Sequence, residues 1–141
     1  MKNKKPLLFQ DHTIPAQEAV SRTTRWRNLY KDVMKCPDEE ILRAFFIPIE
    51  DIIELYNYYT EHQVNLSGIR GYVGHKGVEP IDPQVYECDM MLVPVGLDGK
   101  DIVSAPPSLG LGDGQSTIYD FTSPCPTNCD KTSILYSNPP L

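Results

Sequence analysis

The class of fold is decided by residues 49–73, which read IEDIIELYNYYTEHQVNLSGIRGYV. The first part of this stretch is predicted to be a helix, because Pro48 suits a helix start and two acids follow it in the first turn, where the helix dipole favours them. After Gly68 the apolar period changes from about 3.6 to about 2 residues, and residues 69–73 are predicted to be a strand. A helix followed by a strand within one short stretch predicts a chain of the α+β class.

Upstream of this stretch, the spacing of apolar residues predicts an amphipathic helix over residues 15–35. Trp26 is expected to face the core, with Arg25 and Arg27 flanking it. Residues 41–46 are compatible with a helix or a short strand. If residues 44–47 form a strand, then residues 44–73 form a strand-helix-strand unit with two parallel strands.

Downstream, residues 85–95 are predicted to be a long strand, covered on both faces where Met90 to Val93 form an apolar run. Asp98 and Gly99 indicate a turn, and short strands are expected at residues 101–103 and 118–121. The fold is therefore predicted to be α+β, with N-terminal helices packed on a small mixed or antiparallel sheet of three to five strands. An extended tail rich in proline and cysteine is expected to fold back on it.

Length and composition predict one domain. Residues 1–14 would form an N-terminal arm, residues 15–103 the α+β body, and residues 104–141 a Gly/Pro-rich linker and the cysteine-bearing tail. The glycines at 110–114 are interpreted as part of that linker, because no helix follows them to complete a phosphate-binding loop.

Charge is distributed unevenly over the 141 residues, with eight Lys or Arg against three acids up to Lys35 and five against sixteen beyond it. The net charge of −6 argues against nucleic-acid binding, since phosphate contacts need clustered basic charge. No apolar run is long enough to cross a bilayer, and the apolar residues after the basic start stop too early for a signal peptide. The expected location is the cytoplasm, without membrane association.

The tail carries the most unusual chemistry, PCPTNC at residues 124–129. Cys125 and Cys129 are four residues apart, a spacing that permits a metal pair, a disulfide, or two reduced side chains that pack the tail on the body. Reduced packing is the preferred interpretation, because cytoplasmic cysteines are kept reduced. If a metal were bound, the candidate ligands would be Cys125, Cys129, Asp120, Asp130 and His75.

No catalytic constellation is recognised, and no cofactor is predicted. Glu50, Asp51 and Glu54 crowd the start of a helix, where acids are expected from the dipole alone. The apolar stripe of that helix is expected to be buried, and it consists of Ile49, Ile52, Ile53, Tyr56 and Tyr59. Aromatic residues are candidates for an interface, since a ring is buried there while its hydroxyl stays wet. These interaction candidates are Trp26, Tyr56, Tyr58 and Tyr59.

Four short segments together resemble a group of small uncharacterised bacterial proteins. They are FIPIED at 46–51, IRGY at 69–72, MLVPV at 91–95, and YDF at 119–121 followed by PCP and Cys129. No activity is known for that group, so the resemblance implies no function and no site. The favoured function is a non-enzymatic binding or interaction module, with a homodimer or another protein as partner and no small-molecule ligand named. The alternative is a thiol or metal site on Cys125 and Cys129, serving redox sensing or structural metal binding.

Overall fold

A computed structural model describes residues 12–77, 88–104 and 116–137. The described residues contain two helices and two antiparallel sheets of two strands each, which confirms the α+β class. In chain order the elements are α1 (Ala16–Asp32), a 3₁₀ turn (Asp38–Glu40), β1 (Ala44–Phe46), α2 (Ile49–Glu61), β2 (Leu66–His75), β3 (Cys88–Gly96) and β4 (Ser123–Cys125). The predicted arm and linker lie largely outside the described residues.

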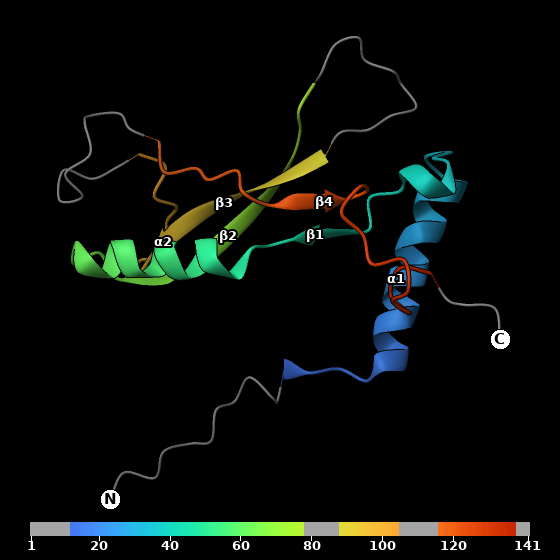
Figure 1. Cartoon of the computed structure of the whole chain (residues 1–141), viewed down its shortest axis with the longest axis horizontal. Helices are drawn as coiled ribbons and strands as arrows, with labels where there is room; N and C mark the ends of the chain where they lie inside the picture. Colours follow the sequence, from blue (N-terminus) through green and yellow to red (C-terminus); the bar gives the residue numbers. More distant parts are fainter. Residues whose placement is uncertain (1–11, 78–87, 105–115, 138–141) are drawn as a thin grey trace, which may run out of the picture.

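The strands do not form the single sheet of three to five strands that the sequence predicts. β2 and β3 form a long antiparallel ladder from Leu66 opposite Gly96 to His75 opposite Cys88. β1 pairs with β4 from the tail, with Ala44 opposite Cys125 (Figure 1). The predicted parallel pairing of residues 44–47 with 69–73 is wrong, because the returning tail strand pairs with β1 instead. The strands predicted at 101–103 and 118–121 are reduced to single bridges, Val95 to Asp101 and Leu92 to Tyr119.

β3 is buried from Leu92 to Val95, whereas Met90 and Met91 of the same apolar run are half-buried. Leu92, Val93 and Val95 are each less than 7% exposed. β2 lies along one edge of β3. The chain after residue 116 runs along the other edge, where Tyr119 and Leu92 exchange two backbone hydrogen bonds of 2.8 and 2.9 Å. The hydroxyl of Thr122 donates to the carbonyl of Met90 at 2.6 Å. The tail is therefore attached to the body at several points before the cysteines begin.

α2 lies along the β2–β3 ladder (Figure 1), and its buried edge is narrower than its sequence predicts. Leu55 and Tyr59 are the buried residues of this helix, and they pack against Tyr119 and Phe121 among others. The Tyr59 hydroxyl lies 2.9 Å from that of Tyr119. Burial, followed by the hydrogen bond with Tyr119, raises the pKa of Tyr59.

Most of the rest of the predicted stripe of α2 is exposed, and Ile52 is half-buried. Ile49, Ile53 and Tyr56 are 68%, 51% and 59% exposed, so the prediction that they are buried is wrong. The helix presents its Leu55–Tyr59 edge to the tail, and the apolar stripe is too wide for that contact to cover. This half of the helix is an apolar surface without a cover among the described residues.

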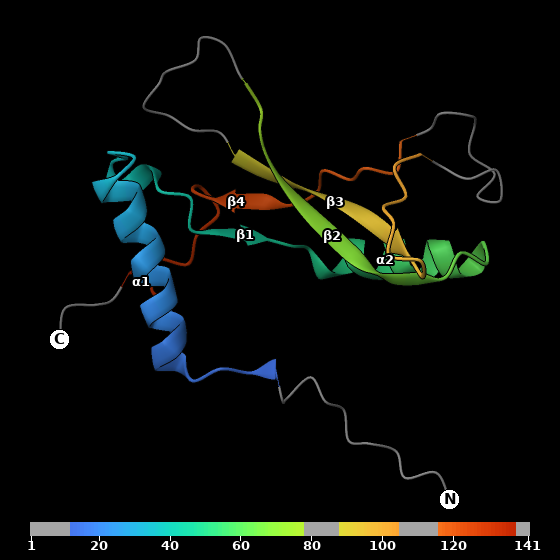
Figure 2. The same ribbon diagram turned by 180° about the vertical axis from the view of Figure 1, so that it is seen from behind.

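α1 lies at the opposite end of the molecule from α2, as both views show (Figures 1 and 2). The prediction that Trp26 faces the core is wrong, although Val20 of the same helix is buried. Arg27 is 6% exposed and Trp26 is 43% exposed, although Trp26 donates a hydrogen bond of 2.6 Å to the carbonyl of Leu42. Here α1 packs against the later part of the tail, where the Nη1 of Arg27 donates to the backbone carbonyl of Leu135. No helix of the described residues is long and apolar enough to span a bilayer.

Candidate functional site

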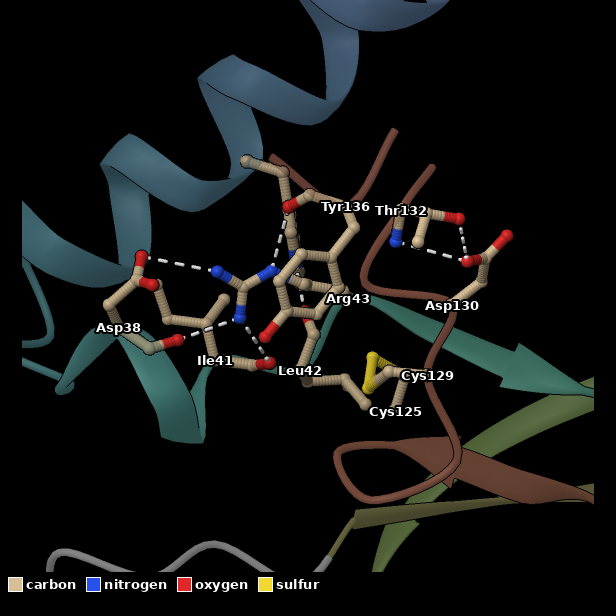
Figure 3. Close-up of a disulfide and its surroundings, with 10 residues drawn as sticks. Asp38, Ile41, Leu42, Arg43, Cys125, Cys129, Asp130, Thr132 and Tyr136 are labelled. Carbon is tan, nitrogen blue, oxygen red and sulfur yellow. Dashed lines mark hydrogen bonds and ion pairs between the residues drawn. A yellow bond between two sulfur atoms is a disulfide. The ribbon is translucent and has the colours of Figure 1, made fainter. Parts of the chain in front are cut away.

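The tail turn is closed by a disulfide between Cys125 and Cys129 (Figure 3). Their Cα atoms are 4.8 Å apart, which is within the usual range for such a bond. Cys125 ends β4 and is 2% exposed, so the bridge begins inside the structure. The backbone N–H of Asn128 donates to the carbonyl of Pro124 at 2.9 Å and completes the turn. The preferred sequence interpretation, two reduced cysteines that pack the tail on the body, is therefore wrong about the oxidation state of these cysteines.

Arg43 connects this turn to the body. Its Nε donates to the carbonyl of Tyr136 at 2.9 Å and its Nη1 to the carbonyl of Asp38 at 2.7 Å. Its guanidinium lies 4.2 Å from the centre of the Tyr136 ring (Figure 3). The backbone N–H of Arg43 also donates to the carbonyl of Cys125 at 2.8 Å. Residue 43 therefore holds the tail at two points, at Cys125 in the turn and at Tyr136 beyond it.

Two cations share the carboxylate of Asp38 beside this contact. Asp38 accepts from Lys31 at 2.8 Å and from Arg43 at 3.1 Å. The hydrogen bond from Lys31, followed by the charge of Arg43, lowers the pKa of Asp38. Arg27 reaches the same tail from α1, and its Nη1 donates to the carbonyl of Leu135 at 3.1 Å. Two arginines thus satisfy backbone carbonyls of the tail, which is a structural use of their charge.

The metal candidates are not brought together. Cys125 and Cys129 are in the disulfide, and the thiolates that bind metals are not available while it is intact. His75 accepts a hydrogen bond from the N–H of Gly77, and Asp130 accepts from Thr132, which lowers the pKa of Asp130. Asp120 is exposed. Across residues 12–77, 88–104 and 116–137, no group of three or more His, Cys, Asp or Glu is arranged to hold a metal ion.

The other two cysteines are free thiols. Cys36 is buried after α1, and burial followed by the charge of Glu40 raises its pKa. Cys88 begins β3, and burial followed by the charge of Asp89 raises its pKa. A raised pKa lowers the thiolate fraction, so neither thiol is in an environment that activates a nucleophile.

The interaction candidates occupy different environments. Tyr59 is fully buried and belongs to the core, whereas Tyr56 is 59% exposed on the outer side of α2. Tyr58 is half-buried, with its ring against those of Tyr59 and His62. Trp26 is at the other end of the molecule, where its ring lies 4.9 Å from that of Tyr30. The four residues therefore do not form one surface.

Two hollows border α2, and sequence reasoning did not identify either. A groove of about 400 Å³ separates α2 from the start of β2, and Ile52, Ile53, Tyr56 and Ile69 line it together with other residues. A pocket of about 450 Å³ lies between α2 and residues 116–121. In the sequence, the available signal for these hollows was the wide apolar stripe of the helix, but such a stripe is as compatible with a buried helix side as with an exposed one.

Comparison of the chain with protein-family models, with curated protein sequences and with solved structures found no match.

Proposed function

We propose that this protein is a non-enzymatic interaction module that associates with a second copy of itself through α2 and β2. The surface involved, called here the α2–β2 face, consists of Ile49, Ile52, Ile53, Tyr56 and Ile69. The observation that carries the proposal is the exposure of this face. Three of its side chains are more than half exposed, on a helix that packs against the tail through its Leu55–Tyr59 edge.

Exposed apolar side chains that are scattered singly need no explanation, but contiguous ones mark interaction surfaces. Here Ile49, Ile53 and Tyr56 follow one another at intervals of four and three residues, which places them in one row along α2. The row borders the groove between α2 and β2. The apolar side chains are therefore contiguous and belong to two elements.

A second copy is the partner that this shape fits best. The face supplies a ridge, the row on α2, and beside it a groove of about 400 Å³. In an interface with twofold symmetry the same patch is used by both copies, so the ridge of each can lie in the groove of the other. Helix ridges pack into grooves in this way throughout proteins. The net charge of −6 opposes such association, and screening by salt should strengthen it.

The experiment compares two aspartate substitutions by light scattering over a protein concentration series. Ile53→Asp puts a charge in the face, whereas Val33→Asp puts one on a side chain that is 69% exposed at the end of α1. We expect Ile53→Asp to weaken association by at least about tenfold, and Val33→Asp to leave it within about twofold. Circular dichroism verifies that both variants fold. Equal masses for Ile53→Asp and the parent protein would contradict the proposal, as would a wild-type chain that stays monomeric throughout a salt series.

The alternative is a redox function at Cys125 and Cys129, and the disulfide is the observation that favours it. In this proposal reduction breaks the bond that closes the tail turn, and the turn is then attached to the body only through Arg43 and β1. Disulfides persist in oxidising compartments and are rare in the cytosol. The bond therefore opposes the predicted cytoplasmic location unless it forms only transiently there. Thiol trapping in intact cells decides whether the bond is stable or the compartment is reducing. Alkylation of all four cysteines would exclude a stable disulfide, and alkylation of only two cysteines would exclude a reducing compartment.

A further inference from the structure

The pocket between α2 and the tail has a defined and rigid lining. It consists of Asp51, Glu54, Leu55, Tyr58, Ser116, Tyr119 and Phe121, and its volume is about 450 Å³. Tyr119 is fixed by its backbone pairing with Leu92 and by its hydroxyl contact with Tyr59. The Tyr119 and Phe121 ring centroids are 6.3 Å apart. The pocket is therefore preformed by groups that also make the core.

The contribution of α2 to this pocket is one side of the helix. Residues 51, 54, 55 and 58 follow the helical spacing of three and four, so their side chains form a single row. The row begins with the carboxylates of Asp51 and Glu54 and continues with apolar and aromatic groups. This row is separate from the α2–β2 face, although Leu55 lines both the pocket and the groove.

The helix dipole explains Asp51 but not Glu54, so the sequence interpretation that the dipole alone accounts for these acids holds only for the first turn. Asp51 stands in the first turn of α2, where a negative charge is favoured without any ligand. Glu54 stands in the second turn, and the effect of the dipole falls off within the first. The described residues that line the pocket include no Lys, Arg or His. The lining thus has two negative charges beside aromatic rings.

Such a lining is complementary to a cation that is planar and carried on an apolar stem. Aromatic faces attract cations, and a guanidinium stacks on a ring while its N–H groups form a fork that matches carboxylate oxygens. An anionic ligand would be repelled by both acids. The volume lies within the usual range of preformed ligand pockets. We propose that this acidic aromatic pocket binds the side chain of an arginine presented by a partner peptide.

The test titrates three peptides into isotope-labelled full-length protein and follows backbone amide shifts by NMR. The peptides are acetyl-Gly-Arg-Gly-amide and its versions with lysine or citrulline, the latter an uncharged analogue of arginine with nearly the same shape. We expect the arginine peptide to shift amides of residues 51–58 and 116–121 and to bind at least about tenfold more tightly than the citrulline peptide. The lysine peptide should bind more weakly than the arginine peptide.

Two double variants with the same charge change complete the test. Asp51→Asn with Glu54→Gln should weaken arginine binding by at least about tenfold, whereas Glu50→Gln with Glu61→Gln, on the same helix outside the lining, should change it less than about threefold. Equal binding of the citrulline or lysine peptide, equal losses in the two double variants, or shifts confined to other residues would each overturn the proposal. Self-association through the α2–β2 face is measured separately with Ile53→Asp, so the two proposals fail independently.

Discussion

Replacing Arg43 with lysine tests whether the tail turn is held as the structure shows. The guanidinium makes its two short backbone bonds to the carbonyls of Asp38 and Tyr136, a longer one of 3.5 Å to that of Ile41, and one to the Asp38 carboxylate. It also stacks on the Tyr136 ring, and only 4% of the Arg43 side chain is exposed. A lysine keeps the charge, but its ammonium can reach only one of the two carbonyls and has no plane to stack. One lost hydrogen bond is about 1 kcal/mol and the lost stacking about 1 kcal/mol, so we expect a loss of about 2 kcal/mol in the free energy of unfolding.

Urea unfolding followed by circular dichroism measures this loss. The matched control is Arg25→Lys, because Arg25 is 68% exposed and lies 3.7 Å from Glu18, so its change should stay within about 0.5 kcal/mol. In a Tyr136→Leu background the cost of Arg43→Lys should fall by about 1 kcal/mol, since the stacking is already gone. A loss for Arg43→Lys no larger than that of the control would refute the reasoning, and so would a cost unchanged by Tyr136→Leu.

Three further outcomes are expected. Replacing both Cys125 and Cys129 with serine should lower the free energy of unfolding by about 2 kcal/mol, the loop entropy of so short a ring, and a variant as stable as the parent in urea would contradict this. The pKa of Asp38 in the folded state lies below its unfolded value of about 3.9, so the stability that Asp38 contributes is complete above about pH 3.9 and disappears as the pH falls through the folded-state pKa. The Asp38→Asn variant should therefore lose less stability than the parent protein between pH 5 and pH 2, measured by urea unfolding at each pH. The raised pKa values of Cys36 and Cys88 predict slow alkylation of the native protein at pH 8, slower than that of a free cysteine peptide, and equal rates measured by mass spectrometry would exclude the buried settings described.

The sequence predicts local elements well where one pattern dominates. The helix start at Pro48 and the buried strand around Leu92 are both found, because a proline that suits the first turn and an uninterrupted apolar run each favour one conformation. The α+β class follows from those two elements. Pairing between distant segments was not predictable in the same way. β1 pairs with β4 across nearly eighty residues, and nothing in the short segments AFF and SPC specifies that partner.

The prediction of which side of each helix is buried was also partly wrong, because that side depends on the chemistry of the segment that packs against the helix. Sequence periodicity assumes that a helix buries its apolar side. On α1 this holds for Val20 but fails for Trp26, because the buried side also contains Arg27, whose Nη1 donates to the carbonyl of Leu135. On α2 the stripe is wider than its contact, so Ile53 and Tyr56 remain exposed. For the candidate site, the sequence identified Cys125 and Cys129 and allowed a disulfide, but the two hollows beside α2 require knowledge of what packs against the helix.

The most direct test of the central claim is whether two copies touch through the α2–β2 face. An NMR sample that mixes isotope-labelled and unlabelled chains reports contacts between copies alone. The proposal predicts intermolecular contacts that involve the methyl groups of Ile53 and Ile69 and the ring of Tyr56, and that strengthen with added salt as the net charge of −6 is screened. Intermolecular contacts that avoid these three residues, or their absence from a concentrated sample at every salt concentration, would contradict it.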